Sequence, residues 1–152
     1  MESDAVKTAL PLIKKYEGFR ENAYLCPAGV WTIGYGTTRM NGRPVKKGDK
    51  ITQKVAEQLL LQSVTSFEAG ILKVVKVPLS NNQAAALISF VYNVGQGAFN
   101  SSTMLRLLNR KYYAAAAEQF NRWVHGGGHI LPGLVKRRAE ERALFEAPEV
   151  QK

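Results

Sequence analysis

A long run of apolar residues at helical spacing in the middle of the chain limits the possible folds more than any other feature. From Thr52 onward, apolar side chains recur at steps of three and four residues, at Ala56, Leu60, Val64, Phe67, Ile71 and Val75. This spacing predicts one long amphipathic helix, which needs packing partners along its length. Val77-Pro78 then ends the helix, because proline cannot continue it.

The chain after Pro78 again has helical patterns. Ser80 and Gln83 predict a capping box. In this motif each of the two side chains accepts a hydrogen bond from the backbone N–H group of the other residue. The helix that follows has an apolar side formed by Leu87, Phe90, Val91 and Val94, and Gly95 closes it. Shorter helices are expected near residues 102–109, 111–122 and 133–146. This half of the chain is therefore predicted to be a helical bundle.

The first third of the chain changes its pattern at Gly18. Residues 3–16 predict an amphipathic helix that Ser3 caps, that Pro11 kinks or divides, and that Gly18 ends. Residues 23–47 are rich in Gly, Thr, Tyr and Val. Within them, Asn41-Gly42 is typical of a two-residue hairpin turn, since both positions of that turn need a positive φ. We expect a small antiparallel sheet here.

This order of elements predicts an α+β fold that is mainly α. We expect an N-terminal helix, a small antiparallel sheet, a long connecting helix and a C-terminal helical bundle. The 152 residues suit a single domain, 1–152, and the 45% of hydrophobic residues suffice for a core. We expect a small lobe over about 16–55 and a helical lobe over about 56–147 with the N-terminal helix. A cleft is expected between the two lobes.

The charge of the chain favours a polyanionic partner. Twenty-one Lys and Arg residues against 12 Asp and Glu give a formal net charge of +9, which suits nucleic acid, an anionic membrane or a bacterial envelope. The basic residues form scattered short groups, such as Lys14-Lys15 and Lys46-Lys47, and no groove-reading motif or aromatic platform accompanies them. We therefore expect the envelope, and no nucleic acid, as the partner.

Several other functions lack their sequence features. His125 and His129 are four residues apart, but three glycines separate them and the glutamate of a helical zinc motif is missing, so we expect no metal and no cofactor. Cys26 is the single cysteine, so no internal disulfide forms and synthesis in a reducing compartment is favoured. No run of about 18 apolar residues occurs and the start lacks a signal-peptide pattern. We expect no stable membrane insertion.

Residues 16–38, YEGFRENAYLCPAGVWTIGYGTT, contain the most promising chemical groups. Glu17 stands at a predicted helix end, where the negative end of the helix dipole favours a neutral, protonated carboxyl group. Packing against Tyr16, Phe19 or Trp31 would act in the same direction. A protonated carboxyl is what a glycosidase needs to protonate its leaving oxygen. From spacing alone, a surface glutamate at a helix end remains the alternative.

The same segment resembles the active-site signature of the phage lysozymes, glycoside hydrolase family 24. That signature has Glu, then eight residues, Asp or Cys, then five residues and Thr, and Glu17, Cys26 and Thr32 match both gaps. The run TIGYGTT at 32–38 also matches. QAAALISFVYNVGQGAF at 83–99 and GLVKRRAEERALF at 133–145 are similar to later family segments, so the resemblance covers nearly the whole chain.

The resemblance implies a two-lobed endolysin that hydrolyses the β-1,4 bond between N-acetylmuramic acid and N-acetylglucosamine in bacterial peptidoglycan, for host cell lysis. By position, Glu17 is the general acid, Cys26 stands on the other face of the sugar, and Thr32 helps to hold the attacking water. Cys26 takes the place of a better-known Asp, as a thiolate base, as a nucleophile, or as a structural residue only. The expected substrate-binding residues are Tyr35, Gly36, Tyr92, Asn93, Ser102 and Arg137.

Other interpretations of these residues remain open. Tyr92 fits a core residue equally well, and Ser102 fits a helix cap. Arg137 or Arg138 would favour the ionised form of Glu17 if it pairs with that carboxylate, or would belong to a solvated basic face. A lytic transglycosylase and an inactive peptidoglycan-binding module are the rival functions. The family also implies a protein that stays in the host cytoplasm until a holin opens the membrane, and then reaches the periplasm and cell wall. A monomer is the default expectation.

Overall fold

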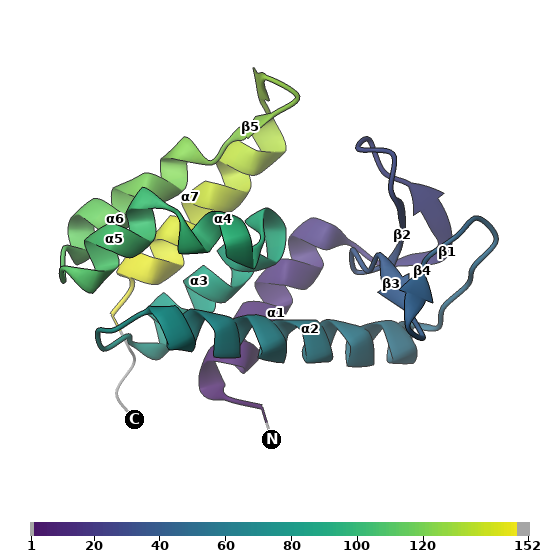
Figure 1. Cartoon of the computed structure of the whole chain (residues 1–152), viewed down its shortest axis with the longest axis horizontal. Coiled ribbons are helices and arrows are strands. Elements are labelled where there is room, and N and C mark those ends of the chain that lie inside the picture. The colour runs from purple at the N-terminus through teal and green to yellow at the C-terminus, as the bar shows by residue number, and fades with distance from the viewer. Residues whose placement is uncertain (1, 149–152) are drawn as a thin grey trace.

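The structure, a computed structural model, describes residues 2–148. Small β elements lie toward one end of a long helix and a group of helices lies toward its other end (Figure 1). The helices are α1 (Asp4–Glu17), α2 (Gln53–Val74), α3 (Asn81–Val94), α4 (Gln96–Asn100), α5 (Thr103–Asn109), α6 (Tyr113–Gln119) and α7 (Pro132–Glu146), with a 3-10 turn η1 (Phe120–Arg122). The predicted α+β class, mainly α, is confirmed.

The long helix α2 forms as its apolar spacing predicts. Thr52 caps it by accepting a hydrogen bond from the Val55 N–H group, and the helix ends at Val74, before Val77-Pro78. Its buried residues are Ala56, Leu60, Val64 and Ile71. These side chains share one side of the helix, because positions three and four residues apart lie on one face. Ala56 on this side packs against Gly34 of the β region.

Helix α1 begins and ends at the predicted residues. The Ser3 side chain accepts from the Val6 N–H group, and Gly18 ends the helix with a φ of 68°. The expected division at Pro11 is wrong, since the helix runs through that residue. Proline removes one helical hydrogen bond. The burial of Ala9 and Ile13 on either side of Pro11 compensates for this loss and keeps the segment helical.

The β region forms two small sheets instead of one. Strands β1 (Arg20–Leu25) and β2 (Trp31–Gly34) pair antiparallel, and so do β3 (Arg39–Met40) and β4 (Arg43–Pro44). The turn between β3 and β4 is the predicted one, with a φ of 55° at Asn41 and 76° at Gly42. Gly34 and Gly36 also have positive φ. They turn the chain sharply between β2 and β3, and this turn separates the two sheets.

Helix α3 is at the centre of the helical group. Its residues 84–91 are all buried, and the helix packs against α1, α2 and α7. The predicted capping box of Ser80 and Gln83 is present. An aromatic cluster of Phe90, Phe120, Trp123 and Phe145 joins α3 to α7 and η1. This packing fixes the C-terminal end of α3 beside α7.

Two elements were not expected from the sequence. Helix α4 follows α3 after the single residue Gly95, and a short hairpin of β5 (His125–Gly126) and β6 (His129–Ile130) precedes α7. The two histidines therefore lie on hairpin strands and not on a helix. Among residues 2–148, no helix is both long enough and apolar enough to span a membrane.

Candidate active site

A cavity of about 410 Å³ opens where the ends of α1 and α3 approach the β region and α2. Its walls come from the end of α1, the turn after β2, the start of β3, the middle of α2 and the last turn of α3. The lining residues are Glu17, Gly36, Thr37, Thr38, Arg39, Ser63, Phe67, Tyr92 and Asn93. Residues from α1, the β region, α2 and α3 thus share one polar cavity.

Glu17 presents its carboxylate to this cavity. Its Oε2 atom accepts a hydrogen bond of 2.8 Å from Nη1 of Arg137, and its side chain is 20% exposed. The other oxygen, Oε1, lies against Gly36, where an added Cβ would come within 2.9 Å of it. Gly36 therefore leaves the room that the carboxylate occupies, and the positive φ of 89° at Gly36 also favours glycine.

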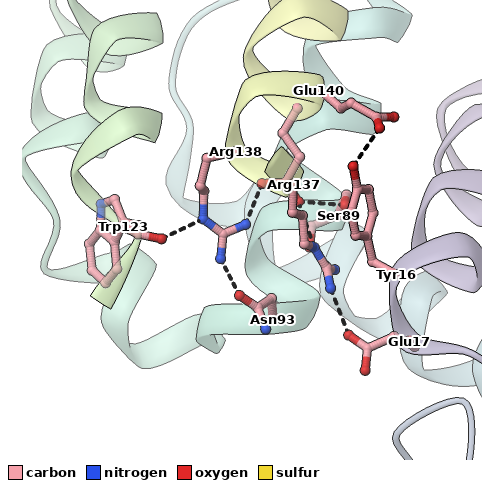
Figure 2. A network of polar contacts seen from close by, with 9 residues as sticks. Tyr16, Glu17, Ser89, Asn93, Trp123, Arg137, Arg138 and Glu140 are labelled. Carbon is pink, nitrogen blue, oxygen red and sulfur yellow. Dashed lines mark hydrogen bonds and ion pairs between the residues drawn. The ribbon is translucent and has the colours of Figure 1, made fainter. Parts of the chain in front are cut away.

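Arg137 and Arg138 of α7 are drawn in Figure 2. Both are buried, and both donate to the buried carboxylate of Glu141. Arg137 donates to Glu141 at 3.1 Å, and the Ser89 hydroxyl donates to the same carboxylate at 2.5 Å. Burial lowers the pKa of the Arg138 guanidinium, and the Glu141 carboxylate opposes that shift. The expected pairing with Glu17 is made by Arg137, whereas Arg138 binds elsewhere.

Tyr16 lies beside Arg137 and binds Glu140. Its hydroxyl donates to Glu140, which also binds Lys15 at 2.5 Å. Burial, together with the hydrogen bond to Glu140, raises the pKa of Tyr16 to about 12. The Arg137 guanidinium lies 5.7 Å from the centre of the Tyr16 ring, a cation–π distance. Arg137 is thereby held between Tyr16 and Glu141.

Tyr35, Gly36 and Tyr92 are brought together by a hydrogen bond between two elements. The Tyr92 hydroxyl donates to the Tyr35 carbonyl oxygen, and burial raises the pKa of the Tyr92 phenol. Tyr35 is buried and its hydroxyl accepts from Gln53 at 3.2 Å. Gly36 and Tyr92 line the cavity and Tyr35 stands behind them.

Cys26 and Thr32 lie together in the β1–β2 hairpin and do not line the cavity that contains Glu17. Thr32 is buried and its hydroxyl donates to the Val30 carbonyl oxygen at 3.0 Å. The Val30 backbone N–H group, followed by that of Ala28 and the Thr32 hydroxyl, lowers the pKa of the partly exposed Cys26 thiol. Their catalytic roles remain predictions.

Ser102 lies at the start of α5 and does not line the cavity. Its hydroxyl accepts from the Leu105 N–H group at 3.1 Å and donates to the Phe99 carbonyl oxygen at 2.7 Å. Both bonds belong to a helix cap, which is the alternative considered above. Its contact with the glycan remains a prediction.

Sequence reasoning missed Glu141 and Ser89. Glu141 stands four residues after Arg137 and three after Arg138, a spacing that places all three on one side of α7 and signals their pairing. Ser89 has no such signal, since 52 residues separate it from Glu141. The described residues contain no cluster of three or more His, Cys, Asp and Glu side chains suited to a metal ion.

We expect the Cys26 thiol to react with iodoacetamide at a lower pH in the folded protein than in the unfolded chain. Its pKa is lowered in the folded state, so the thiolate forms at a lower pH. The midpoint of the rate–pH profile, measured with and without denaturant, tests this. Thr32→Val should raise the folded midpoint. A folded midpoint at or above that of the unfolded chain would contradict the expectation.

Comparison with known proteins places the chain among phage enzymes. A family model described as Phage lysozyme matches residues 14–141. The chain is 45% identical over 142 residues to the endolysin of Acyrthosiphon pisum secondary endosymbiont phage 1, covering 91% of this chain and 94% of that protein. It is 43% identical over 143 residues to the endolysin of Bacillus phage PZA, covering 93% of this chain but only 54% of that protein.

Solved structures agree with these relatives. The endolysin from Escherichia coli O157:H7 phage FAHEc1 superposes with a TM-score of 0.85 at 38% identity, covering 96% of this chain and 95% of that one. The muramidase domain of SpmX from Asticcacaulis excentricus gives a TM-score of 0.80 at 33% identity, covering 97% of each chain. The resemblance inferred from the spacing of Glu17, Cys26 and Thr32 is confirmed. The chain belongs to the phage lysozyme family and is a glycosidase of the lysozyme type.

Proposed function

We propose that this chain is an endolysin that hydrolyses the β-1,4 bond between N-acetylmuramic acid and N-acetylglucosamine in bacterial peptidoglycan. The observation that carries the proposal is the position of Glu17. Its carboxyl group lines a polar cavity, one oxygen is held by Arg137 at 2.8 Å, and the other lies over Gly36. A carboxyl group fixed in this way can protonate the oxygen of a glycosidic bond that enters the cavity.

Cys26 and Thr32 are proposed to act on the opposite face of the sugar. The lowered pKa of Cys26 supports a thiolate, which accepts a proton from an attacking water or itself attacks the anomeric carbon. Thr32 hydrogen-bonds within the same turn and helps to hold the water. Water attack inverts the anomeric configuration and attack by the thiolate retains it, so the product anomer distinguishes the two routes.

The remaining site residues are proposed to bind the glycan or to hold in place the residues that contact it. Gly36 and Asn93 line the cavity and meet the sugars directly, while Tyr92 supports the Tyr35–Gly36 turn through its hydroxyl. Arg137 orients Glu17. Ser102 caps α5 with both of its hydrogen bonds and is proposed to contact the glycan from the start of that helix.

The cellular setting is part of the same proposal. Proteins named endolysins match most of this chain, and this supports an enzyme that acts on the cell wall of a phage host. The +9 net charge suits an anionic envelope. We propose a monomer that is held in the host cytoplasm, is released by a holin, and then reaches peptidoglycan.

Product analysis on purified peptidoglycan tests the function. The expected products carry reducing muramic acid ends, which borohydride reduction and mass spectrometry identify. Anhydro-muramic ends would show that the enzyme is a lytic transglycosylase, whose reaction uses no water, and not a hydrolase. Binding to the wall without any cleavage would leave only a peptidoglycan-binding module, and either result would overturn the proposal.

A further inference from the structure

The amide of Asn93 is oriented by a buried guanidinium. Nη2 of Arg138 donates a hydrogen bond to Oδ1 of Asn93. Arg138 is 1% exposed, and its other nitrogens donate to the Trp123 carbonyl oxygen at 2.9 Å and to the Glu141 carboxylate. With three different acceptors around one planar group, the guanidinium has a single orientation (Figure 2).

This contact decides which atom of the Asn93 amide faces the cavity. A guanidinium carries only donors, so it selects the amide oxygen and turns the amide nitrogen away. In Figure 2 the amide nitrogen of Asn93 lies on the side opposite Arg138. Within residues 2–148, Nδ2 makes no hydrogen bond, and Asn93 lines the same cavity as Glu17. The cavity wall therefore offers a free N–H donor in a fixed direction.

We propose that Arg138, anchored by Glu141, is a positioning residue that makes Asn93 a donor for an acceptor oxygen of the glycan, the carbonyl oxygen of an N-acetyl group. This inference rests on the proposed glycan substrate. An acetamido carbonyl only accepts, whereas a sugar hydroxyl also donates and would bind either orientation of the amide. A donor fixed in one orientation thus discriminates in favour of N-acetylated sugars.

The buried network has two separate arms. Arg137 reaches Glu17, and Arg138 reaches Asn93, while both share Glu141. The first arm holds the group that transfers a proton. The second arm holds a group that only binds. Loss of the second arm should therefore weaken binding and leave the chemical step unchanged.

Kinetics on a soluble, uncross-linked glycan test the proposal with Arg138→Lys, Asn93→Ala and the double variant. Lysine keeps the positive charge beside Glu141 but cannot bind three acceptors in one plane. We expect Arg138→Lys to raise KM about threefold to tenfold with kcat within about twofold. In the Asn93→Ala background it should add nothing, because its effect passes through Asn93. Arg142→Lys, at an exposed ion pair of the same helix, is the matched control and should leave both constants unchanged.

Asn93→Asp is expected to leave the fold intact, since residue 93 is exposed on the cavity wall. The aspartate still binds Arg138 but presents an oxygen in place of the N–H donor, so it should bind the glycan more weakly than Asn93→Ala. Affinity is measured by calorimetry in a Glu17→Gln background, which reports binding without turnover and independently of the proposed reaction. On glycan stripped of its acetyl groups, Asn93→Ala should no longer change the affinity.

Three results would overturn the proposal. Additive effects of Arg138→Lys and Asn93→Ala would mean that Arg138 acts through the fold alone. Asn93→Asp with unchanged affinity would mean that the amide N–H group binds nothing. An equal loss from Asn93→Ala on acetylated and deacetylated glycan would move the acceptor to a sugar hydroxyl. If the native chain binds the glycan without cutting it, the proposed reaction fails while these binding comparisons still decide the role of Asn93.

Discussion

Glu17→Gln is expected to lower kcat on peptidoglycan by about 10²- to 10⁴-fold while the protein remains folded. The amide oxygen of glutamine still accepts the hydrogen bond that Nη1 of Arg137 donates to Oε2 of Glu17. The side chain keeps its volume beside Gly36, but it has no acidic proton for the leaving oxygen. Initial rates of release of reducing ends, with the thermal unfolding midpoint of each variant, measure the effect.

Glu57→Gln is the matched control for this change. Glu57 pairs with Lys14 across α1 and α2, and its side chain is 44% exposed outside the cavity. Removing this carboxylate changes the net charge by the same amount as Glu17→Gln, so the two variants separate catalysis from charge. A Glu17→Gln enzyme within about tenfold of the native rate would place the proton donor elsewhere.

Local patterns predicted most of the helices because the helix is a local structure. The apolar spacing of α2, the cap of α1 at Ser3 and the capping box of α3 each depend on residues a few positions apart. Pro11 shows the limit of such patterns. Its local preference against a helix interior is outweighed by the packing of Ala9 and Ile13, which only the tertiary structure contains.

The candidate site was only partly predictable. Glu17 came from a signature whose three residues lie within one segment, but the cavity around it needs α2 and α3, which no local pattern places beside α1. Ser89 and Glu141 show the same limit, because their contact joins residues 52 positions apart. Cys26 and Thr32 lie in the β1–β2 hairpin, and their catalytic roles remain predictions from the signature.

Glu141→Gln is expected to lower the free energy of unfolding by about 3–5 kcal/mol. Glu141 is fully buried and accepts from Arg137, Arg138 and Ser89. A neutral amide leaves two buried guanidinium groups with Glu17 as their one remaining carboxylate partner in this network, and an uncompensated buried charge is costly. Urea denaturation at neutral pH measures the change.

Glu146→Gln is the matched control for Glu141→Gln. Arg137–Glu141 and Arg142–Glu146 are both pairs four residues apart on α7, but the first is buried and Glu146 is 49% exposed. Exposed pairs contribute at most about 1 kcal/mol, because water already solvates both charges. The same chemical change on one helix should therefore cost several times more at residue 141 than at residue 146. Equal losses would show that burial of Glu141 does not govern its contribution, and the network would then be a consequence of the fold and not one of its supports.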